Sequence, residues 1–241
     1  QAKVTAAFSQ DGIPGFGAAM ADRCATGAAH RFHFGGLHIE CRHVAASQCY
    51  QLHVRSRPMQ IDAEFDAAGP MLLAVGAVAG GSMHATQKSS ARALRGELRL
   101  AASRHALDGG VASFDYSNGL LARDTAWRWA SAHSSDIGFN LQAGYFGAHE
   151  NALWLDGHLI ALGAAEFGFD PDNPMAMWRV RTDDGLLDLS FQPRGMRRVD
   201  KNQLIAANRY VQPIGLFNGW VKAGADATPR PVQNLIGVTE D

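Results

Sequence analysis

Strict alternation of apolar and polar residues marks three consecutive segments: residues 37–42 (LHIECR), 50–55 (YQLHVR) and 59–66 (MQIDAEFD). Successive side chains of a β-strand point to opposite faces of the sheet, so each segment has one apolar and one polar face. The links between the segments, residues 45–48 and 56–58, are short. The three segments therefore predict neighbouring antiparallel strands in a meander.

The first link also sets the register of the first hairpin. Counting back from it places Glu40 opposite His53 and His38 opposite Arg55. A third ligand on that face is not evident, and the HxH or HxxxH spacing with a supporting carboxylate that would suit zinc is missing. We therefore expect solvated cross-strand pairs here and no metal site.

Strand patterns continue towards the C-terminus, with turn signals about every 8–12 residues. Asp156-Gly157 and Asp184-Gly185 each lie between two apolar runs. Asp-Gly favours a tight hairpin because both central turn positions need positive φ. Only residues 89–94 and 202–208 suit short helices. About ten to fourteen strands of this kind predict an all-β sandwich or barrel.

The composition fits a folded globular protein, since 46% of the 241 residues are hydrophobic and 19% are charged. Lys and Arg number 22 against 23 Asp and Glu, which argues against nucleic acid or an anionic membrane as the partner. The longest apolar run, residues 70–79, is far shorter than the ~20 residues of a membrane span. The first ten residues show no signal-peptide pattern, so we expect a soluble, cytoplasmic protein; a mature chain whose leader had been removed would show the same pattern.

Cys24, Cys41 and Cys49 are an odd number without CxxC spacing. They predict reduced, half-buried thiols rather than a disulfide framework or a zinc ribbon. The chain also lacks a recognisable dinucleotide-binding loop, nucleophile elbow or phosphate-binding loop. We therefore expect no cofactor.

Seven short motifs follow one another from residue 86 onward: TQK (86–88), GLLARDTAWRWA (119–130), GFNLQAG (138–144), ENALWLDG (150–157), WRV (178–180), DLSFQP (188–193) and GVTED (237–241). In this order they resemble a family of lipocalin-like proteins catalogued as a domain of unknown function. That family is similar, more distantly, to the two-barrel proteins that include carotenoid 1,2-hydratases, kievitone hydratase and decalin-forming cyclases. The resemblance implies two antiparallel lipocalin-like barrels or curved sheets, and cofactor-free proton chemistry inside an apolar barrel.

Two departures from the family bear on the domains. Family members carry a further N-terminal stretch and continue past GVTED, so this chain is expected to begin inside the first barrel and to stop inside the final motif. A barrel that lacks a strand has an open edge, through which we expect a homodimer. Asp108-Gly109-Gly110 separates the expected domains, an incomplete barrel-like half at 1–110 and a second half at 111–241.

Candidate site residues are densest between Asp115 and Asn151. Arg128 alternates with Trp127 and Trp129 on one expected strand, so it points to the opposite face. If the tryptophans pack outward or into the core, Arg128 lies inside the barrel; if they do not, the tryptophans line it. On the next strand, two amides share a face opposite three apolar residues: Asn140 and Gln142 against Ile137, Phe139 and Leu141.

The functional hypothesis makes Glu150 or Asp115 the proton donor, with Arg128 and Asn140 orienting the substrate. The substrate-binding residues are then Trp127, Trp129, Asn140, Asn151 and Trp154. We expect Arg128 to hold Glu150 or Asp115 in a water-poor cavity with Trp, Phe and Leu walls. The structural alternative is that Arg128 forms a buried tie with a carboxylate and the tryptophans are ordinary core residues.

Two functions from different classes fit this pattern. One is a cofactor-independent lyase, hydratase or isomerase acting on a hydrophobic small molecule; the other is a non-catalytic carrier of an apolar ligand. Only the enzyme needs a carboxyl group held protonated near neutral pH. Arg128 and Glu150 on opposite faces of the sheet would refute this constellation and favour the carrier. His84, beside the TQK motif, is expected to be a surface-loop histidine.

Overall fold

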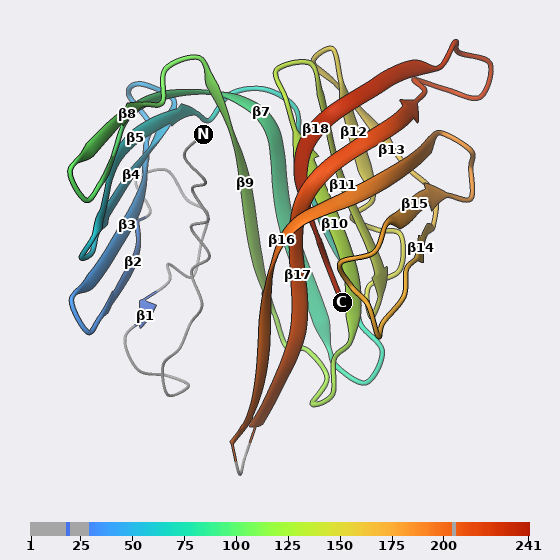
Figure 1. The fold of residues 1–241 in the computed structure, drawn as a ribbon, viewed down its shortest axis with the longest axis horizontal. Coiled ribbons are helices and arrows are strands. Elements are labelled where there is room, and N and C mark those ends of the chain that lie inside the picture. Colours follow the sequence, from blue (N-terminus) through green and yellow to red (C-terminus); the bar gives the residue numbers. More distant parts are fainter. Residues whose placement is uncertain (1–17, 20–28, 204–205) are drawn as a thin grey trace. The chain divides into compact units, whose positions relative to one another are not determined.

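The structure is a computed structural model that describes residues 18–19, 29–203 and 206–241 (Figure 1). Within these ranges the secondary structure is entirely β, which confirms the predicted all-β class. The strands of the first sheet are β1 (Ala18–Ala19), β2 (Ala29–Phe34), β3 (Leu37–Val44), β4 (Cys49–Arg55), β5 (Met59–Asp66), β6 (Met71–Ala77), β7 (Met83–Leu100), β8 (Ser103–Ala106) and β9 (Gly110–Gly119). Those of the second sheet are β10 (Trp127–His133), β11 (Ile137–Gly144), β12 (Ala152–Leu155), β13 (His158–Ala161), β14 (Ala165–Gly168), β15 (Trp178–Thr182), β16 (Leu187–Gln203), β17 (Ala206–Val221) and β18 (Arg230–Glu240).

The first sheet contains the predicted meander. Its order is β1-β2-β3-β4-β5-β7-β6, and β8 and β9 also pair with β7. Glu40 lies opposite His53 and His38 opposite Arg55, so the register counted from the sequence is confirmed. His53 Nδ1 lies 2.8 Å from Asp62 Oδ1 on the next strand, so its partner is a solvated cross-strand carboxylate.

Strand β7 is where the helix prediction fails. Residues 89–94 are part of this 18-residue strand. Ser89 pairs with Met71 of β6, and Leu94 pairs with Phe65 of β5. Ala91 has φ 54°, at the point where β7 changes partner. Pairing with β6 at the start of this segment and with β5 at its end overrides the weak local helix preference of so short a segment.

The second predicted helix, residues 202–208, is also wrong for the residues that the structure describes. Asn202 pairs with Ala207, and Lys201 pairs with Asn208, across the β16–β17 hairpin. Residues 204–205 lie outside the described ranges. The long β16–β17 ladder supplies the backbone hydrogen bonds that a short isolated helix would lack at its ends.

Both Asp-Gly hairpins form in the second sheet, whose order is β13-β12-β11-β10-β18-β17-β16-β15-β14. Asp156 and Gly157 have φ 49° and 79°, as the tight turn between β12 and β13 requires. The second loop is longer: Gly185 has φ 67°, while the Asp184 carboxylate accepts hydrogen bonds from the Leu186 and Gly163 amides at 3.0 and 2.6 Å.

Two of the three cysteines lie in the described residues, on β3 and β4. Cys41 and Cys49 are free thiols, as predicted, although Cys49 is fully rather than half buried. Burial raises the pKa of Cys41 to about 11. Cys24 lies outside the described residues.

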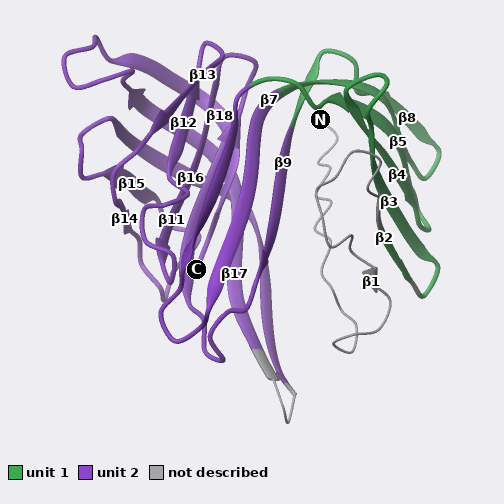
Figure 2. Ribbon diagram, turned by 180° about the vertical axis from the view of Figure 1, so that it is seen from behind, with its two compact units in different colours: residues 1–69, 92–112 green, residues 70–91, 113–241 purple. Residues whose placement is uncertain are grey.

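The chain forms two compact units, 1–69 with 92–112 and 70–91 with 113–241 (Figure 2). Strands β7 and β9 therefore each contribute to both units. The expected domains 1–110 and 111–241 stay a prediction, because compactness alone does not identify an independently folding domain. No helix of the described residues is both long and apolar enough to cross a membrane.

The core of the second unit determines which face of β10 and β11 is left for a site. Ile137, Phe139 and Leu141 of β11 belong to one buried apolar cluster. In that cluster the Phe139 and Phe217 rings meet edge to face at 5.0 Å. Because side chains alternate along a strand, Asn140 and Gln142 point to the other face, as predicted.

Candidate functional site

The opposite face of β10 and β11 forms the floor of a polar hollow. Trp129 of β10 lies between Gln142 of β11 and Glu240 of β18 in the sheet register. Trp127 is two residues earlier on β10, and therefore on the same face. The hollow has a volume of about 210 Å³ and is lined by Lys88, Asp115, Trp127, Trp129, Gln142, Glu150 and Glu240.

Lys88 of β7 joins the two carboxylates that were predicted as proton donors. Its Nζ lies 3.0 Å from Glu150 Oε2 and 2.6 Å from Asp115 Oδ2. The Lys88 and Glu150 side chains are only 7% and 4% exposed, whereas Asp115 is 46% exposed. A buried ion pair is thus extended to a carboxylate that solvent can reach.

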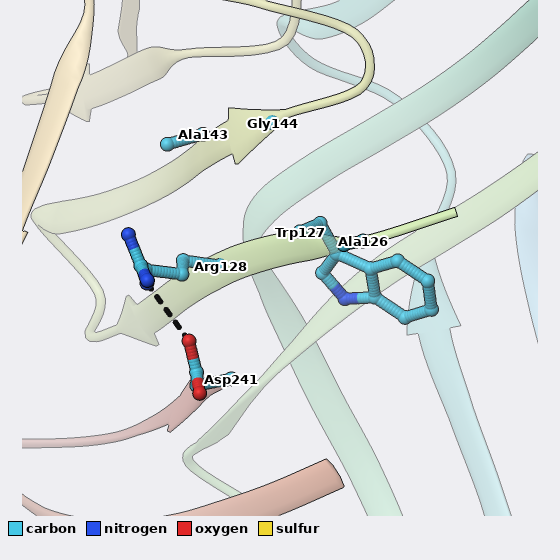
Figure 3. Close-up of a pocket in the computed structure, with 6 residues that line it drawn as sticks. All are labelled: Ala126, Trp127, Arg128, Ala143, Gly144 and Asp241. Carbon is cyan, nitrogen blue, oxygen red and sulfur yellow. Dashed lines mark hydrogen bonds and ion pairs between the residues drawn. The ribbon is translucent and has the colours of Figure 1, made fainter. Parts of the chain in front are cut away.

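Arg128 does not take part in this group, and the expected tie to Glu150 or Asp115 is wrong. Arg128 Nε donates a hydrogen bond to Asp241 Oδ1 at 2.8 Å, and its guanidinium lies over the Phe169 ring. Figure 3 shows Arg128 pointing towards Asp241 and away from the Trp127 ring. The alternation along β10 places Arg128 opposite the tryptophans, and the tryptophans face the hollow.

Glu240 is a carboxyl group that was not among the predicted site residues. Trp127 Nε1 donates to its Oε1 at 2.8 Å, and Gln212 Nε2 donates to its Oε2 at 2.7 Å. Burial raises the pKa of Glu240, and the negative charge of Asp115 acts in the same direction. The hollow therefore has on its wall a carboxyl group whose neutral form is favoured by its surroundings.

Three of the predicted substrate-binding residues do not line the hollow, and two of them, Asn140 and Asn151, bind residues that do. Asn140 accepts a hydrogen bond from Trp129 Nε1 and donates to the Glu150 carbonyl, at 2.8 and 2.9 Å. Asn151 Oδ1 accepts from the Gln142 backbone amide at 2.6 Å, and Trp154 Nε1 donates to the Pro70 carbonyl at 3.1 Å.

The expectation of a surface-loop histidine at position 84 is wrong. His84 lies on β7 and is 2% exposed. Its Nε2 is 3.3 Å from the Tyr145 hydroxyl, and its ring meets the Phe146 ring edge to face. Burial raises the pKa of Tyr145 to about 12, with added contributions from the charges of Glu150 and Asp115. A neutral phenol therefore lies within the field of the carboxylates.

Lys88 and Glu240 are the ionisable lining residues that the sequence analysis did not identify. Both had a signal, because Lys88 ends the TQK motif and Glu240 lies in GVTED. They were passed over because no local pattern links residue 88 or 240 to residue 150. The described residues contain no group of three or more His, Cys, Asp or Glu side chains placed to hold a metal ion.

Comparison with known proteins confirms the expected family and fold. The profile of a family described as a domain of unknown function (DUF2804) matches residues 2–241. The crystal structure of kievitone hydratase from Nectria haematococca is similar, with a TM-score of 0.58 and 11% identity over 88% of this chain and 82% of that chain. At this identity the likeness shows the fold alone. No curated protein matches the sequence.

Proposed function

Because the chain belongs to the DUF2804 family, whose description names no reaction, we propose a function from the site itself. The function is cofactor-independent proton transfer of the hydratase or lyase type, in which water adds to a small molecule or leaves it. The observation that carries the proposal is the buried Lys88–Glu150 pair in a hollow that also holds Glu240. The similar solved structure is titled a hydratase, which is consistent with this class.

Addition of water to a carbon–carbon double bond needs a base and an acid. We assign the base to Glu150, whose carboxylate Lys88 holds in place at 3.0 Å. As the base takes a proton from water, the oxygen bonds to one carbon, and the acid gives a proton to the other. Elimination is the same sequence reversed.

Glu240 is assigned as the acid in the hydration direction. Its raised pKa keeps a larger fraction of the carboxyl group protonated near neutral pH than an ordinary glutamate would have. Trp127 and Gln212 hold its two oxygens by hydrogen bonds of 2.8 and 2.7 Å. These hydrogen bonds fix the orientation of the carboxyl group, which favours proton transfer to a substrate atom in a defined position.

The same geometry bears on the choice between an enzyme and a carrier. Arg128 and Glu150 lie on opposite faces, the outcome that favours the carrier on the sequence argument. Lys88, however, supplies a cation to the same carboxylates. Five of the lining residues have polar or charged side chains and only Trp127 and Trp129 are aromatic. An apolar cargo would lie mainly against polar and charged side chains, so we rank the enzyme first and the carrier second.

The test is turnover of candidate polyenes, flavonoids and terpenoids, followed as a gain or loss of one water by mass. Glu150→Gln and Glu240→Gln keep side-chain shape and are expected to lower kcat/KM by about 100-fold or more. Glu166→Gln is the matched control, because Glu166 is half exposed and pairs with Arg181 on the β14–β15 hairpin. Full turnover by Glu150→Gln would exclude Glu150 as the base.

The expected homodimer also belongs to the proposal, and we assign it to β6. This strand is at one end of the first sheet among the described residues, and Met71, Leu73 and Val75 are exposed on one face. A charged side chain on an edge strand opposes edge-to-edge pairing, so Leu73→Lys is expected to shift the protein towards monomer. Light scattering of the two proteins at equal concentration measures this; identical masses would contradict the assignment.

A further inference from the structure

Gln142 is the lining residue whose side chain is left without a partner. It lies on β11, is 2% exposed, and faces the hollow. Its backbone amide donates to Asn151 Oδ1, yet neither Nε2 nor Oε1 of its side chain has a hydrogen-bond partner within the described part of the chain. Buried polar atoms are nearly always paired, so this amide needs an explanation.

The neighbours of Gln142 in the hollow have partners of their own. Lys88 and Glu150 form an ion pair, and Trp129 Nε1 donates to Asn140. Both oxygens of Glu240 accept hydrogen bonds, from Trp127 and Gln212. Among the described residues that line the hollow, the side-chain amide of Gln142 is thus the buried group without a hydrogen-bond partner in the protein.

We propose that Gln142 is a specificity-determining residue that binds a neutral ligand through two hydrogen bonds. A primary amide offers a donor and an acceptor side by side, so its complement is a ligand with an acceptor and a donor on neighbouring atoms. Lactams, cyclic imides and other cis-amides have this arrangement. The inference rests on the proposed function in placing the ligand in the same hollow.

The charges around the hollow favour a neutral ligand over an anion. The Asp115 and Glu150 carboxylates face it, against the single cation Lys88, and Glu240 adds no positive charge. A carboxylate ligand would therefore meet repulsion, and it would offer no donor to Gln142 Oε1. The Trp127 and Trp129 side chains provide the apolar surface for the body of a planar ligand.

The experiment compares two probes, 2-pyridone and N-methyl-2-pyridone, which differ in one donor. Binding to the wild-type protein is measured by titration with NMR detection. We expect 2-pyridone to bind about tenfold more tightly, the effect of one good hydrogen bond. Gln142→Met retains the side-chain length and is expected to bind both probes equally. Equal affinities in the wild type, or no binding of either probe, would overturn the inference.

Thermal unfolding of the free protein separates this role from a structural one. Gln142→Met removes an unpartnered buried amide, so Tm is expected to rise by a few degrees. A structural glutamine, or one held by an internal water, would give a lower Tm instead, and that result would overturn the inference. The control Gln192→Met changes an exposed residue on β16 and is expected to alter neither Tm nor probe binding.

Failure of this inference can be told from failure of the proposed function. The Glu150→Gln variant is expected to lose about 100-fold or more in kcat/KM, yet to keep the preference for 2-pyridone over N-methyl-2-pyridone. If Glu150→Gln keeps full turnover and Gln142→Met loses the preference, the proposed role of Gln142 is supported and Glu150 is not the base. If turnover depends on Glu150 but Gln142→Met still prefers 2-pyridone, the proposed role of Gln142 is contradicted and the assignment of Glu150 as the base is not affected.

Discussion

At the scale of single residues, Lys88 forms ion pairs with two carboxylates that differ in their exposure to solvent. Glu150 is almost fully buried, whereas Asp115 is 46% exposed. Lys88→Met leaves the Glu150 carboxylate in the interior without a counter-charge, which costs about 3–5 kcal/mol for buried pairs. We expect urea denaturation to show a loss of that size in the free energy of unfolding.

The matched change on the exposed side is Asp115→Asn. Solvent screens an exposed ion pair, so its loss is expected to cost less than about 1 kcal/mol. Glu150 keeps Lys88 as its partner in this variant. Equal losses in Lys88→Met and Asp115→Asn would contradict the view that burial makes the two halves of the cluster unequal.

His133 is a second residue whose environment predicts a measurable effect. The Ser131 hydroxyl donates a hydrogen bond to the Phe139 carbonyl. His133 Nε2 therefore donates to Ser131 Oγ, at 2.8 Å. His133 Nδ1 therefore accepts from the Ser90 hydroxyl at 2.6 Å. Burial lowers the pKa of His133 to about 4, which keeps the ring neutral in the folded state.

The sign of the pH dependence follows from this lowered pKa. Above the unfolded value of ~6.5 the ring is neutral in both states and contributes no pH dependence. As the pH falls from 7 to 5, protons bind mainly to the unfolded state, which costs about 2 kcal/mol of stability. His133→Asn removes this titration. The stability difference between the wild type and the variant should therefore shrink by about that amount at pH 5; a constant difference would contradict the buried neutral ring.

At the scale of strands, close packing at Gly138 makes the His133 network possible. Gly138 of β11 pairs with His133, and a Cβ there would lie 1.8 Å from Ser90 Oγ and 2.8 Å from His133 Nδ1. Gly138→Ala must displace both groups, so we expect a loss of about 2–4 kcal/mol in urea denaturation.

Gly168 provides the control for that substitution. It lies on the end strand β14 of the second sheet, and a Cβ there would have its nearest neighbours at 3.9 Å. Gly168→Ala is therefore expected to change stability by less than about 0.5 kcal/mol. A similar loss in both variants would show that crowding at Gly138 is not the cause.

Strand patterns and local register could be read from the sequence because they depend on neighbouring segments. Two segments joined by a short link must pair next to that link, which fixed Glu40 opposite His53. Alternation likewise placed Arg128 opposite Trp127 and Trp129, but it left open which face meets the apolar core. That choice depends on what covers the sheet, and period two carries no information about it.

At the scale of the whole chain, the site depends on pairings between distant segments. Lys88, Asp115 and Glu150 come from β7, β9 and the loop before β12, while Glu240 reaches the hollow because β18 pairs with β10. Loop length and turn chemistry do not determine such long-range pairings. Asp115 and Glu150 could be proposed from the sequence, but their common partner Lys88 and the Glu240 carboxyl group could not.

The two compact units differ in how much apolar surface they bury, and this predicts a difference in local stability. The second unit has the large cluster around Phe139, Trp178 and Phe217. Among the described residues of the first unit, the buried hydrophobic side chains are fewer: Cys49, Val54, Ala63, Phe65 and Leu98.

Regions with few buried apolar contacts open at lower free energy. Amide hydrogen exchange followed by mass spectrometry is therefore expected to show β3 and β4 exchanging faster than β11 and β17. The difference should widen at low concentrations of urea, because the first unit loses protection before the second. Cooperative unfolding of the whole chain would instead make all four strands lose protection together at the same urea concentration. In that case stability would be shared through β7 and β9, whose residues belong to both units.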